Sequence, residues 1–444
     1  MNGFIQSNIS NWLEGLEIKD LNPMQEAVLK IAEGEKDIQL LAATGSGKTL
    51  AFLLSVLSKL DINKDRETQA LIVVPTRELA LQIEEVWRKM GVGLKITACY
   101  GGHKREIEEN NLIEAPVLIV GTPGRLADHL RRGNIQSNTI NTLVLDEYDK
   151  SVEWGFQEEI EEIVSKIEYI NFVFLASATK AEEIPSFIPI KSLETLDFRV
   201  EKEESDKIIQ ILVETEKKDK LEELVKLLSA LGERRSIVFC NHKDVVERVS
   251  QNLKELKIPV ASYHGSMQQF ERELALFQFK SGTVNFLITT DLAARGLDID
   301  YIRNIIHLNL PADAATYTHR NGRTARQERT GSIYIMQYKE EQLPDFIEVD
   351  KTWEWKETEK LKLPERSKWS TVYVPLGRKN KLSKGDFVGY FINRGGLKFE
   401  DIGLIEVKDF ISYIAIRRSK VGYVLELVKK ERIKNKKVKM QLVK

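Results

Sequence analysis

The sequence contains only two cysteines, Cys99 and Cys240, among its 444 residues. Two thiols are too few for a disulfide scaffold or a cysteine-rich zinc site, and such sparse usage fits a reducing compartment. The sequence also lacks any apolar run that approaches the ~18 residues of a membrane span. Its first ten residues, MNGFIQSNIS, do not combine a basic start with an apolar core, so we expect no signal peptide. These absences predict a cytoplasmic protein with no membrane partner.

Charge is balanced over the whole chain, with a formal net charge of −1, but it is unevenly distributed. Residues 369–444 hold 18 Lys and Arg against 7 Asp and Glu, whereas residues 1–368 carry a net charge of −12. A basic segment on an acidic body is typical of an appendage that binds a polyanion such as nucleic acid. The alternative interpretation is a solvated charged surface.

Hydrophobic periodicity divides the chain into three parts. Short apolar runs alternate with amphipathic helical patterns between residue 37 and about residue 340, which indicates an α/β fold with parallel strands and crossover helices. The alternation restarts after a charged segment at 200–207, and a second charged segment at 356–368 precedes the basic end. We expect α/β domains at 1–203 and 207–350 and a small α+β domain at 369–444. The strands are predicted at 38–43, 70–74, 117–121, 143–146, 173–176, 236–240, 260–264, 285–290, 304–310, 371–375 and 412–416, and helices at 77–90, 156–167 and 383–392.

A glycine-rich segment, AATGSGKT at residues 42–49, follows the first expected strand and opens a helical pattern. Gly45 and Gly47 would let backbone N–H groups turn toward phosphate oxygens, and the helix N-terminus adds a partial positive charge. Lys48 can reach the outer phosphates of a nucleotide, and Thr49 can hold Mg²⁺. Ala42 stands where the general phosphate-loop pattern has its first glycine. The other loop residues predicted to surround the phosphates are Ala43, Thr44 and Ser46.

An acidic strand end, LVLDEYD at residues 143–149, provides the second half of a nucleotide site. Asp146 would lie at the carboxyl end of a buried strand, next to the loop strand if the sheet is parallel, and could hold Mg²⁺ through water. Glu147 could orient or deprotonate the attacking water. Paired with the phosphate loop, this strand end predicts phosphoryl-transfer chemistry with ATP and Mg²⁺.

Together with these two motifs, residues 4–340 resemble the DEAD-box RNA helicases of superfamily 2. The resemblance rests on an ordered series of segments: NPMQ (22–25), AATGSGKT (42–49), PTREL (75–79), GG (101–102), TPGR (122–125), DEYD (146–149), SAT (177–179), VFCN (238–241), HGSM (264–267), QFER (269–272), TTDLAARGLD (289–298) and HRNGRTAR (319–326). It implies two tandem RecA-like parallel-sheet domains and an ATP-dependent RNA helicase.

The resemblance also implies a role for each matching residue. Gln25 would read adenine, Gly296 and Asp298 would lie near the ribose, and Arg323 and Arg326 would reach the γ-phosphate from the second domain, with Arg326 favoured as the arginine finger. The residues implied to link the ATP and RNA states are Asp149, Ser177, Thr179 and His319. The residues implied to grip RNA phosphates and sugars are Thr76, Arg77, Gly102, Thr122, Arg125, Arg272 and Thr290. Such contacts favour RNA over DNA through its 2′-hydroxyls and shape.

Several positions depart from the family pattern. Ala325 replaces a usual glycine, and Ile18 stands where many members place an aromatic next to adenine. Phe4 resembles the family's upstream aromatic, but its spacing to Gln25 is short, so packing against the core is the alternative. Tyr148 replaces alanine; we expect its side chain to point away from the flanking carboxylates along an extended backbone, into a local gap or rearranged neighbour, without loss of hydrolysis.

Residues 371–416 are similar to the RNA-binding domain at the C-terminus of bacterial DbpA- and CsdA-type DEAD-box proteins, a divergent RRM-like fold. Tyr373 and Tyr413, on two central strands, are the candidates for stacking on RNA bases, although the aromatic-rich RNP signature is absent. The residues predicted to attract phosphates are Arg378, Lys379, Lys381, Arg417, Arg418 and the basic run 429–439. A solvated strand edge is the alternative for that run. His103, His129, His242 and His307 lack metal-ligand spacing and are expected to be surface or core residues.

Three functions are compatible with these features. The first is an RNA-stimulated ATPase that unwinds or remodels structured RNA, with ribosomal RNA during subunit assembly as the expected partner and a monomeric core. The second is an RNA-binding clamp without turnover, and the third is a DNA translocase. Because Lys48, Glu147, Arg323 and Arg326 are all present, the first is favoured over the second. The RNA-type tail argues against the third.

Overall fold

The computed structural model describes residues 3–43, 45–102, 104–153, 155–178, 184–199, 208–291, 302–322, 331–354, 362–434 and 436–443. These residues form two compact units, the first ending at residue 199 and the second starting at residue 208. Six of the predicted site residues lie outside the described residues: Thr44, Thr179, Gly296, Asp298, Arg323 and Arg326. His103 and Ala325 also lie outside them. Within the described residues, no helix is both long and apolar enough to cross a membrane.

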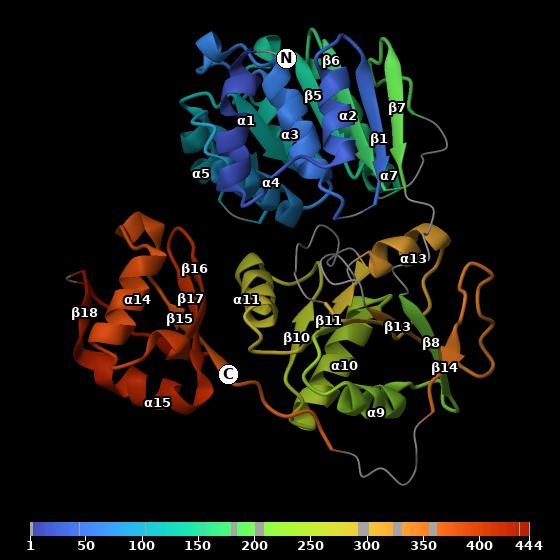
Figure 1. The fold of residues 1–444 in the computed structure, drawn as a ribbon, viewed down its shortest axis with the longest axis vertical. Coiled ribbons are helices and arrows are strands. Elements are labelled where there is room, and N and C mark those ends of the chain that lie inside the picture. The colour runs from blue at the N-terminus through green and yellow to red at the C-terminus, as the bar shows by residue number, and fades with distance from the viewer. Residues whose placement is uncertain are drawn as a thin grey trace. The chain divides into compact units, whose positions relative to one another are not determined.

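The first unit is built on a seven-stranded parallel sheet with strand order β3-β4-β2-β5-β6-β1-β7 (Figure 1). Its strands are β1 (Asp37–Ala42), β2 (Ala70–Val73), β3 (Ile96–Cys99), β4 (Leu118–Gly121), β5 (Thr142–Asp146), β6 (Phe172–Ser177) and β7 (Leu193–Phe198). Its helices are α1 (Gly3–Gly15), α2 (Pro23–Ala32), α3 (Lys48–Lys59), α4 (Arg77–Met90), α5 (Arg105–Leu112), α6 (Pro123–Arg131), α7 (Tyr148–Glu153) and α8 (Gln157–Lys166), with 3-10 turns η1 (Ile62–Lys64) and η2 (Ser137–Thr139).

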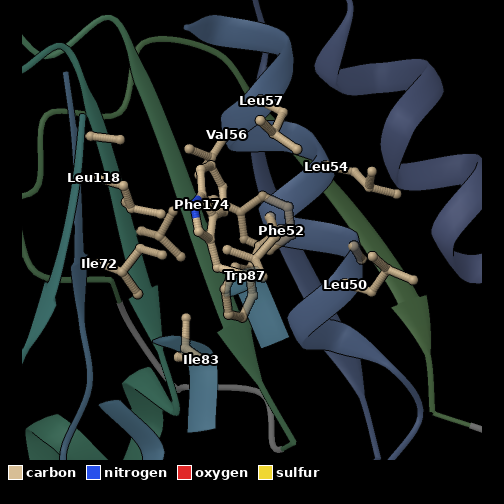
Figure 2. Packing of buried hydrophobic residues seen from close by; sticks show 14 of the residues in the cluster. Leu50, Phe52, Leu54, Val56, Leu57, Ile72, Ile83, Trp87, Leu118 and Phe174 are labelled. Atoms are coloured by element: carbon tan, nitrogen blue, oxygen red, sulfur yellow. The ribbon is translucent and has the colours of Figure 1, made fainter. Parts of the chain in front are cut away.

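Both faces of this sheet are buried, which explains why its central strands are almost wholly apolar. Alternate strand residues point to opposite faces. One face packs against α1 to α4, where Phe52 of α3, Trp87 of α4 and Phe174 of β6 meet in one cluster (Figure 2). The other face packs against α6 and α8 in a second cluster that includes Leu145 and Ile163. This two-sided packing fixes the strand ends that carry the predicted site.

The second unit begins with another seven-stranded parallel sheet, ordered β10-β11-β9-β12-β13-β8-β14. Its strands are β8 (Ile209–Thr215), β9 (Ser236–Cys240), β10 (Val260–Tyr263), β11 (Phe286–Thr290), β12 (Asn304–His307), β13 (Ser332–Tyr338) and β14 (Lys351–Thr352). Its helices are α9 (Leu221–Leu231), α10 (Lys243–Glu255), α11 (Gln269–Lys280) and α13 (Ala314–Asn321). The prediction of two similar parallel-sheet domains is confirmed.

The tail domain, residues 369–443 of the second unit, has a four-stranded antiparallel sheet ordered β16-β17-β15-β20 and a short β18–β19 pair. Its elements are β15 (Trp369–Val374), η3 (Arg378–Asn380), α14 (Lys384–Asn393), η4 (Phe399–Asp401), β16 (Ile402–Val407), β17 (Ser412–Arg417), α15 (Arg418–Leu427), η5 (Val428–Lys430), β18 (Arg432–Ile433), β19 (Lys436–Lys437) and β20 (Gln441–Leu442). One sheet face forms a core with α14 and α15, and this cluster includes Val372 and Ile414 of the sheet and Phe387 and Val424 of the helices. The predicted small α+β domain is therefore present.

Candidate nucleotide site and nucleic-acid interface

The phosphate loop connects the end of β1 to the start of α3, as the sequence predicts. Gly45 and Gly47 have φ angles of 85° and 93°, in the left-handed region that favours glycine. A Cβ on Gly47 would lie 2.5 Å from the Gln25 side-chain nitrogen, so a larger residue would displace Gln25 as well as strain the backbone. The Lys48 ammonium donates to the Ala42 carbonyl at 2.6 Å, which holds a positive charge across the loop. A cation, a helix N-terminus and inward-turning backbone make this loop suited to an anion.

The segment predicted to read adenine is tied to the phosphate loop through two side-chain amides. Asn22 caps α2, and its side-chain oxygen accepts from the Gln25 N–H at 2.9 Å. In return, the Gln25 side-chain oxygen accepts from the Asn22 N–H at 3.0 Å. Asn22 Nδ2 donates to the Ser46 carbonyl at 3.0 Å, and Gln25 Nε2 donates to the Gly47 carbonyl at 3.2 Å. A change in loop conformation is therefore transmitted directly to Gln25.

The two apolar residues near this segment pack against the core of the first unit. Phe4 lies on α1 with its ring centroid 5.5 Å from that of Trp12, in an edge-to-face arrangement. Ile18 contacts the same core cluster. For Phe4 the structure therefore favours the packing alternative over a nucleotide contact.

Asp146 is the last residue of β5 and is buried beside the other acidic residues of the motif. Burial, together with the Glu147 charge, raises the pKa of Asp146 to about 7, and the Lys48 charge partly opposes this rise. The sheet is parallel, but the prediction that Asp146 lies next to the loop strand is wrong, because β6 lies between β1 and β5. Ser177, the last residue of β6, therefore occupies the strand end between the phosphate loop and the acidic motif.

Glu147 adopts a φ angle of 47°, and α7 begins at the next residue. The predicted extended backbone at Tyr148 is therefore wrong, since the chain turns sharply into a helix. The Tyr148 ring, 1% exposed, enters the core cluster that contains Ile160 and Ile163. Its hydroxyl has no hydrogen-bond partner among the described residues, and burial raises the pKa of Tyr148 to about 12.

Strand order brings together three of the segments predicted to contact RNA, because β3, β4 and β2 are neighbours and their carboxyl ends meet at one edge. Thr76 follows β2 and caps α4, accepting from the Leu79 N–H at 3.2 Å. Thr122 follows β4, and its N–H donates to the Cys99 carbonyl at 3.0 Å. Gly102 follows β3 with a φ angle of 101°. A Cβ on Gly102 would lie 2.2 Å from an Arg77 guanidinium nitrogen, so the two segments are in direct contact.

Two residues of the predicted motifs lie in the second unit. Thr290 is the last residue of β11, and His319 is buried on α13. Arg272 lies on α11 and is largely buried. Its guanidinium lies 5.3 Å from the centre of the Tyr263 ring and donates to the Tyr263 hydroxyl at 3.4 Å.

Sequence reasoning missed Arg320, which is fully buried beside His319. Its guanidinium contacts both carboxylate oxygens of Asp291 at 2.5 and 2.7 Å and donates to the Asn309 carbonyl and the Asn241 side chain. One side chain thereby links the ends of β9, β11 and β12 to α13. The sequence feature that could have identified Arg320 is its position directly after His319 in the segment HRNGRTAR.

The tail domain corrects one part of the predicted RNA interface. Tyr413 is 1% exposed and packs against Phe277 of α11, with its hydroxyl 3.5 Å from the Phe270 carbonyl, so it cannot stack on an RNA base in this arrangement. The half-buried Tyr373 belongs to the same cluster, with its ring 6.0 Å from that of Tyr413. The base-stacking prediction is therefore wrong for Tyr413.

The basic residues of the tail differ in their surroundings. Arg417 donates to Asp401 at 2.8 Å and lies over the Trp369 ring, and Arg418 donates to the Ser367 and Trp369 carbonyls. Arg378 and Lys379, on η3, are exposed, and so is Arg418, but the Arg418 guanidinium is engaged by those two carbonyls. Arg378 and Lys379 are therefore better placed than Arg417 and Arg418 to meet a phosphate.

The architecture defined by these observations is a tandem parallel-sheet nucleoside triphosphatase with an appended RNA-binding domain. Three known families match the chain: DEAD/DEAH box helicase at residues 22–187, the helicase conserved C-terminal domain at 219–328, and the DbpA RNA binding domain at 371–442. The chain is 32% identical to the ATP-dependent RNA helicase DbpA of Escherichia coli (strain K12), over 96% of this chain and 94% of that protein. It is 30% identical to the ATP-dependent RNA helicase DbpA of Bacillus subtilis (strain 168), over 98% and 97%.

Solved structures support the same assignment. The DEAD-box helicase Mss116 bound to ssRNA and UDP-BeF superposes with a TM-score of 0.69 at 27% identity, covering 79% of this chain and 78% of that chain. S. cerevisiae Dbp5 bound to RNA and ADP BeF3 gives a TM-score of 0.66 at 28% identity, covering 74% and 87%. The chain therefore belongs to the DEAD-box family of ATP-dependent RNA helicases and carries a DbpA RNA binding domain.

Proposed function

We propose that the protein acts in the cytoplasm as a monomer that hydrolyses ATP to separate or remodel short structured segments of RNA, with ribosomal RNA during subunit assembly as its substrate. The observation that carries this proposal is the shared edge of the first sheet. The phosphate loop after β1, the carboxylates after β5 and the segments after β2, β3 and β4 all lie at the carboxyl ends of one parallel sheet. Nucleotide and RNA contacts built on one rigid edge can influence each other.

Mg²⁺ fits the acidic motif of this site. Thr49 follows the loop lysine, and Asp146 lies buried with its pKa raised to about 7 by burial and by the Glu147 charge, a repulsion that a divalent cation would relieve. Oε2 of Glu147 is buried without a hydrogen-bond partner among the described residues. Such an oxygen is suited to accept a proton or hydrogen bond from water. When bound, Mg²⁺ would neutralise charge on the phosphates; Thr49 and Asp146 would hold it, and Glu147 would orient the attacking water.

The tail domain would hold the enzyme on its RNA. Its positive charge attracts phosphates without reading bases. Tethering raises the local concentration of RNA at the first sheet without adding a catalytic contact. The exposed residues Arg378 and Lys379 are the proposed phosphate contacts.

Steady-state ATP hydrolysis with and without structured RNA tests the proposal. We expect RNA to stimulate the wild-type enzyme strongly and Glu147→Gln to remove the stimulated turnover, because an amide cannot take the proton of the attacking water. Glu158→Gln, an exposed change on α8, is the matched control and should behave like the wild type. Wild-type turnover with RNA no faster than that of Glu147→Gln would overturn the enzymatic proposal in favour of a clamp. DNA in place of RNA tests the choice of nucleic acid, and crosslinking with sequencing from cells tests ribosomal RNA.

A further inference from the structure

The carboxylate of Glu108 lies inside the first unit, 1% exposed, where the ends of β3 and β4 meet α6. Three groups among the described residues lie within hydrogen-bond distance of it. The Tyr100 N–H donates to Oε1 at 2.8 Å, while the Arg125 guanidinium and the His129 Nε2 each lie 2.7 Å from Oε2. Burial of an isolated carboxylate is strongly unfavourable, so these three hydrogen bonds are needed to stabilise the negative charge of Glu108 inside the protein.

The geometry of α6 explains why two of these partners converge on one oxygen. Arg125 and His129 are four residues apart and therefore project from the same face of the helix. The Nδ1 atom of His129 lies 3.1 Å from the side-chain amide nitrogen of Asn134, which can only donate. Nδ1 must then accept, so Nε2 carries a proton and donates it to Glu108. The fully buried histidine thus serves as a fixed donor to the carboxylate.

This arrangement fixes two segments that the sequence assigns to RNA binding. The contact with Glu108 uses one of the five N–H donors of Arg125 and sets the plane of its guanidinium, whose side chain is 15% exposed. The bond from Tyr100 fixes the backbone that leads into Gly101 and Gly102, the surface against which Arg77 lies. One buried carboxylate therefore sets the relative positions of these two segments at the sheet edge.

A metal centre is the competing interpretation of this cluster. Potential ligand atoms of Cys99, Glu108 and His129 lie within 4.8 Å of one another, and all three residues are buried. However, a guanidinium 2.7 Å from the same carboxylate oxygen would repel a cation. Burial, followed by the Glu108 charge, also raises the pKa of the Cys99 thiol well above its usual value, which disfavours the thiolate that a metal requires. The hydrogen-bond network accounts for the arrangement.

We propose that Glu108, backed by His129, is a positioning residue for RNA: it orients Arg125 and the backbone before Gly101 so that both meet the RNA backbone without reorganisation. The inference rests on the proposed function, because it takes Arg125 to be an RNA contact. It assigns Glu108 no part in nucleotide binding or in chemistry.

The test measures ATP turnover against RNA concentration for Glu108→Ala and Glu108→Gln in the full chain. We expect Glu108→Ala to raise the RNA concentration for half-maximal turnover about tenfold, the effect of losing a charge-assisted hydrogen bond. Turnover at saturating RNA and the affinity for a fluorescent ATP analogue should stay near wild type. Glu108→Gln retains an acceptor oxygen and the side-chain volume, so a smaller, two- to fivefold rise is expected. Glu106→Gln, an exposed position on the same helix α5, is the matched control and should leave the RNA dependence unchanged.

A double-mutant cycle with Arg125→Ala separates positioning from a general structural role. If Glu108 acts through Arg125, the effect of Glu108→Gln on RNA affinity should shrink once Arg125 is alanine, to the part that the Tyr100 N–H carries. Fully additive effects would overturn the inference, and so would unchanged RNA dependence in a Glu108→Gln variant that binds the ATP analogue normally. If Glu108→Ala fails to fold, Glu108→Gln decides the matter alone. Stoichiometric metal in the purified protein would also overturn it. Absence of RNA stimulation in the wild type would instead refute the proposed function itself.

Discussion

The ring of Tyr413 lies 5.4 Å, centroid to centroid, from the ring of Phe277 on α11, so the sheet face of the tail domain packs against the second parallel-sheet domain. Polar contacts extend this interface. The Thr371 hydroxyl donates to the Thr283 hydroxyl at 3.0 Å, and the Ser367 hydroxyl donates to the Gly282 carbonyl. The interface occupies the face on which RRM-like folds normally stack bases, and it leaves Arg378 and Lys379 exposed.

The first prediction is that this interface can be locked by a disulfide. The hydroxyls of Thr283 and Thr371 are 3.0 Å apart, so Thr283→Cys combined with Thr371→Cys should form an intramolecular disulfide under mild oxidation. The native thiols of Cys99 and Cys240 are buried and should not compete. Non-reducing electrophoresis after proteolysis between the two domains measures the crosslink.

The matched control pairs Thr283→Cys with Ser419→Cys, an exposed position on α15. It should crosslink much more slowly. Equal crosslinking rates for the two pairs would mean that the tail domain is not held against α11. RNA-stimulated turnover should survive the correct crosslink, since the interface buries none of the exposed basic residues on η3.

The second prediction concerns Gly102, whose φ angle of 101° and contact with Arg77 exclude a side chain. Gly102→Ala should force the Arg77 guanidinium away and strain the backbone by about 1–2 kcal/mol. We expect a fivefold or greater rise in the RNA concentration for half-maximal ATP turnover, with ATP affinity unchanged. Gly101→Ala is the control, because a Cβ there would be 3.4 Å from Arg77, at tolerable distance. If both variants bind RNA like the wild type, the contact between these segments has no part in RNA binding.

The strands predicted from sequence are the ones buried on both faces, because continuous apolar runs such as those of β2 and β4 leave a clear local signal. By contrast, β7 at the sheet edge alternates half-buried and exposed residues, and its LETLDF sequence gave no such signal. Strand order is not a local property, which is why β6 was not foreseen between β1 and β5.

The site was predictable where all of its residues lie close together in one motif, as in the phosphate loop. It was not predictable where a residue contacts side chains that are distant in sequence. The positive φ of Glu147 and the carboxylate of Glu108 depend on contacts that no motif encodes. The sequence pattern around an outward-facing strand aromatic such as Tyr413 is the same whether the ring stacks on a base or packs against a helix. Only the packing against Phe277 decides between them.

The third prediction concerns acid sensitivity at His307, which is fully buried at the end of β12. Burial, followed by the charge of Arg320, lowers its pKa to about 3, whereas an exposed histidine in the unfolded chain has a pKa near 6.5. Between these values the unfolded state binds a proton that the folded state does not. The free energy of unfolding should therefore fall as pH decreases below 6.5, by up to ~1.4 kcal/mol per pH unit from this residue.

Hydrogen exchange of the segment that contains β12, compared at pH 6.5 and pH 5 after correction for intrinsic rates, measures this effect. His307→Gln should lower protection at both values but reduce its dependence on pH. His242→Gln, an exposed position at the start of α10, should retain the wild-type dependence. Equal pH dependence in wild type and His307→Gln would show that another group controls acid sensitivity here.

The fourth prediction concerns Tyr148, whose buried hydroxyl lacks a hydrogen-bond partner among the described residues while its ring fills a core cluster. Removing an unsatisfied buried hydroxyl is neutral or favourable, so Tyr148→Phe should unfold at the same or slightly higher denaturant concentration, within about 1 kcal/mol. Tyr148→Ala should cost ~3–5 kcal/mol, since the core cannot fill the space left by the ring. Tyr169→Phe, at an exposed tyrosine of the same unit, is the control and should change neither stability nor turnover. Because the ring packs into the core, RNA-stimulated turnover of Tyr148→Phe should equal that of the wild type; a several-fold change would mean that the hydroxyl takes part in the nucleotide site.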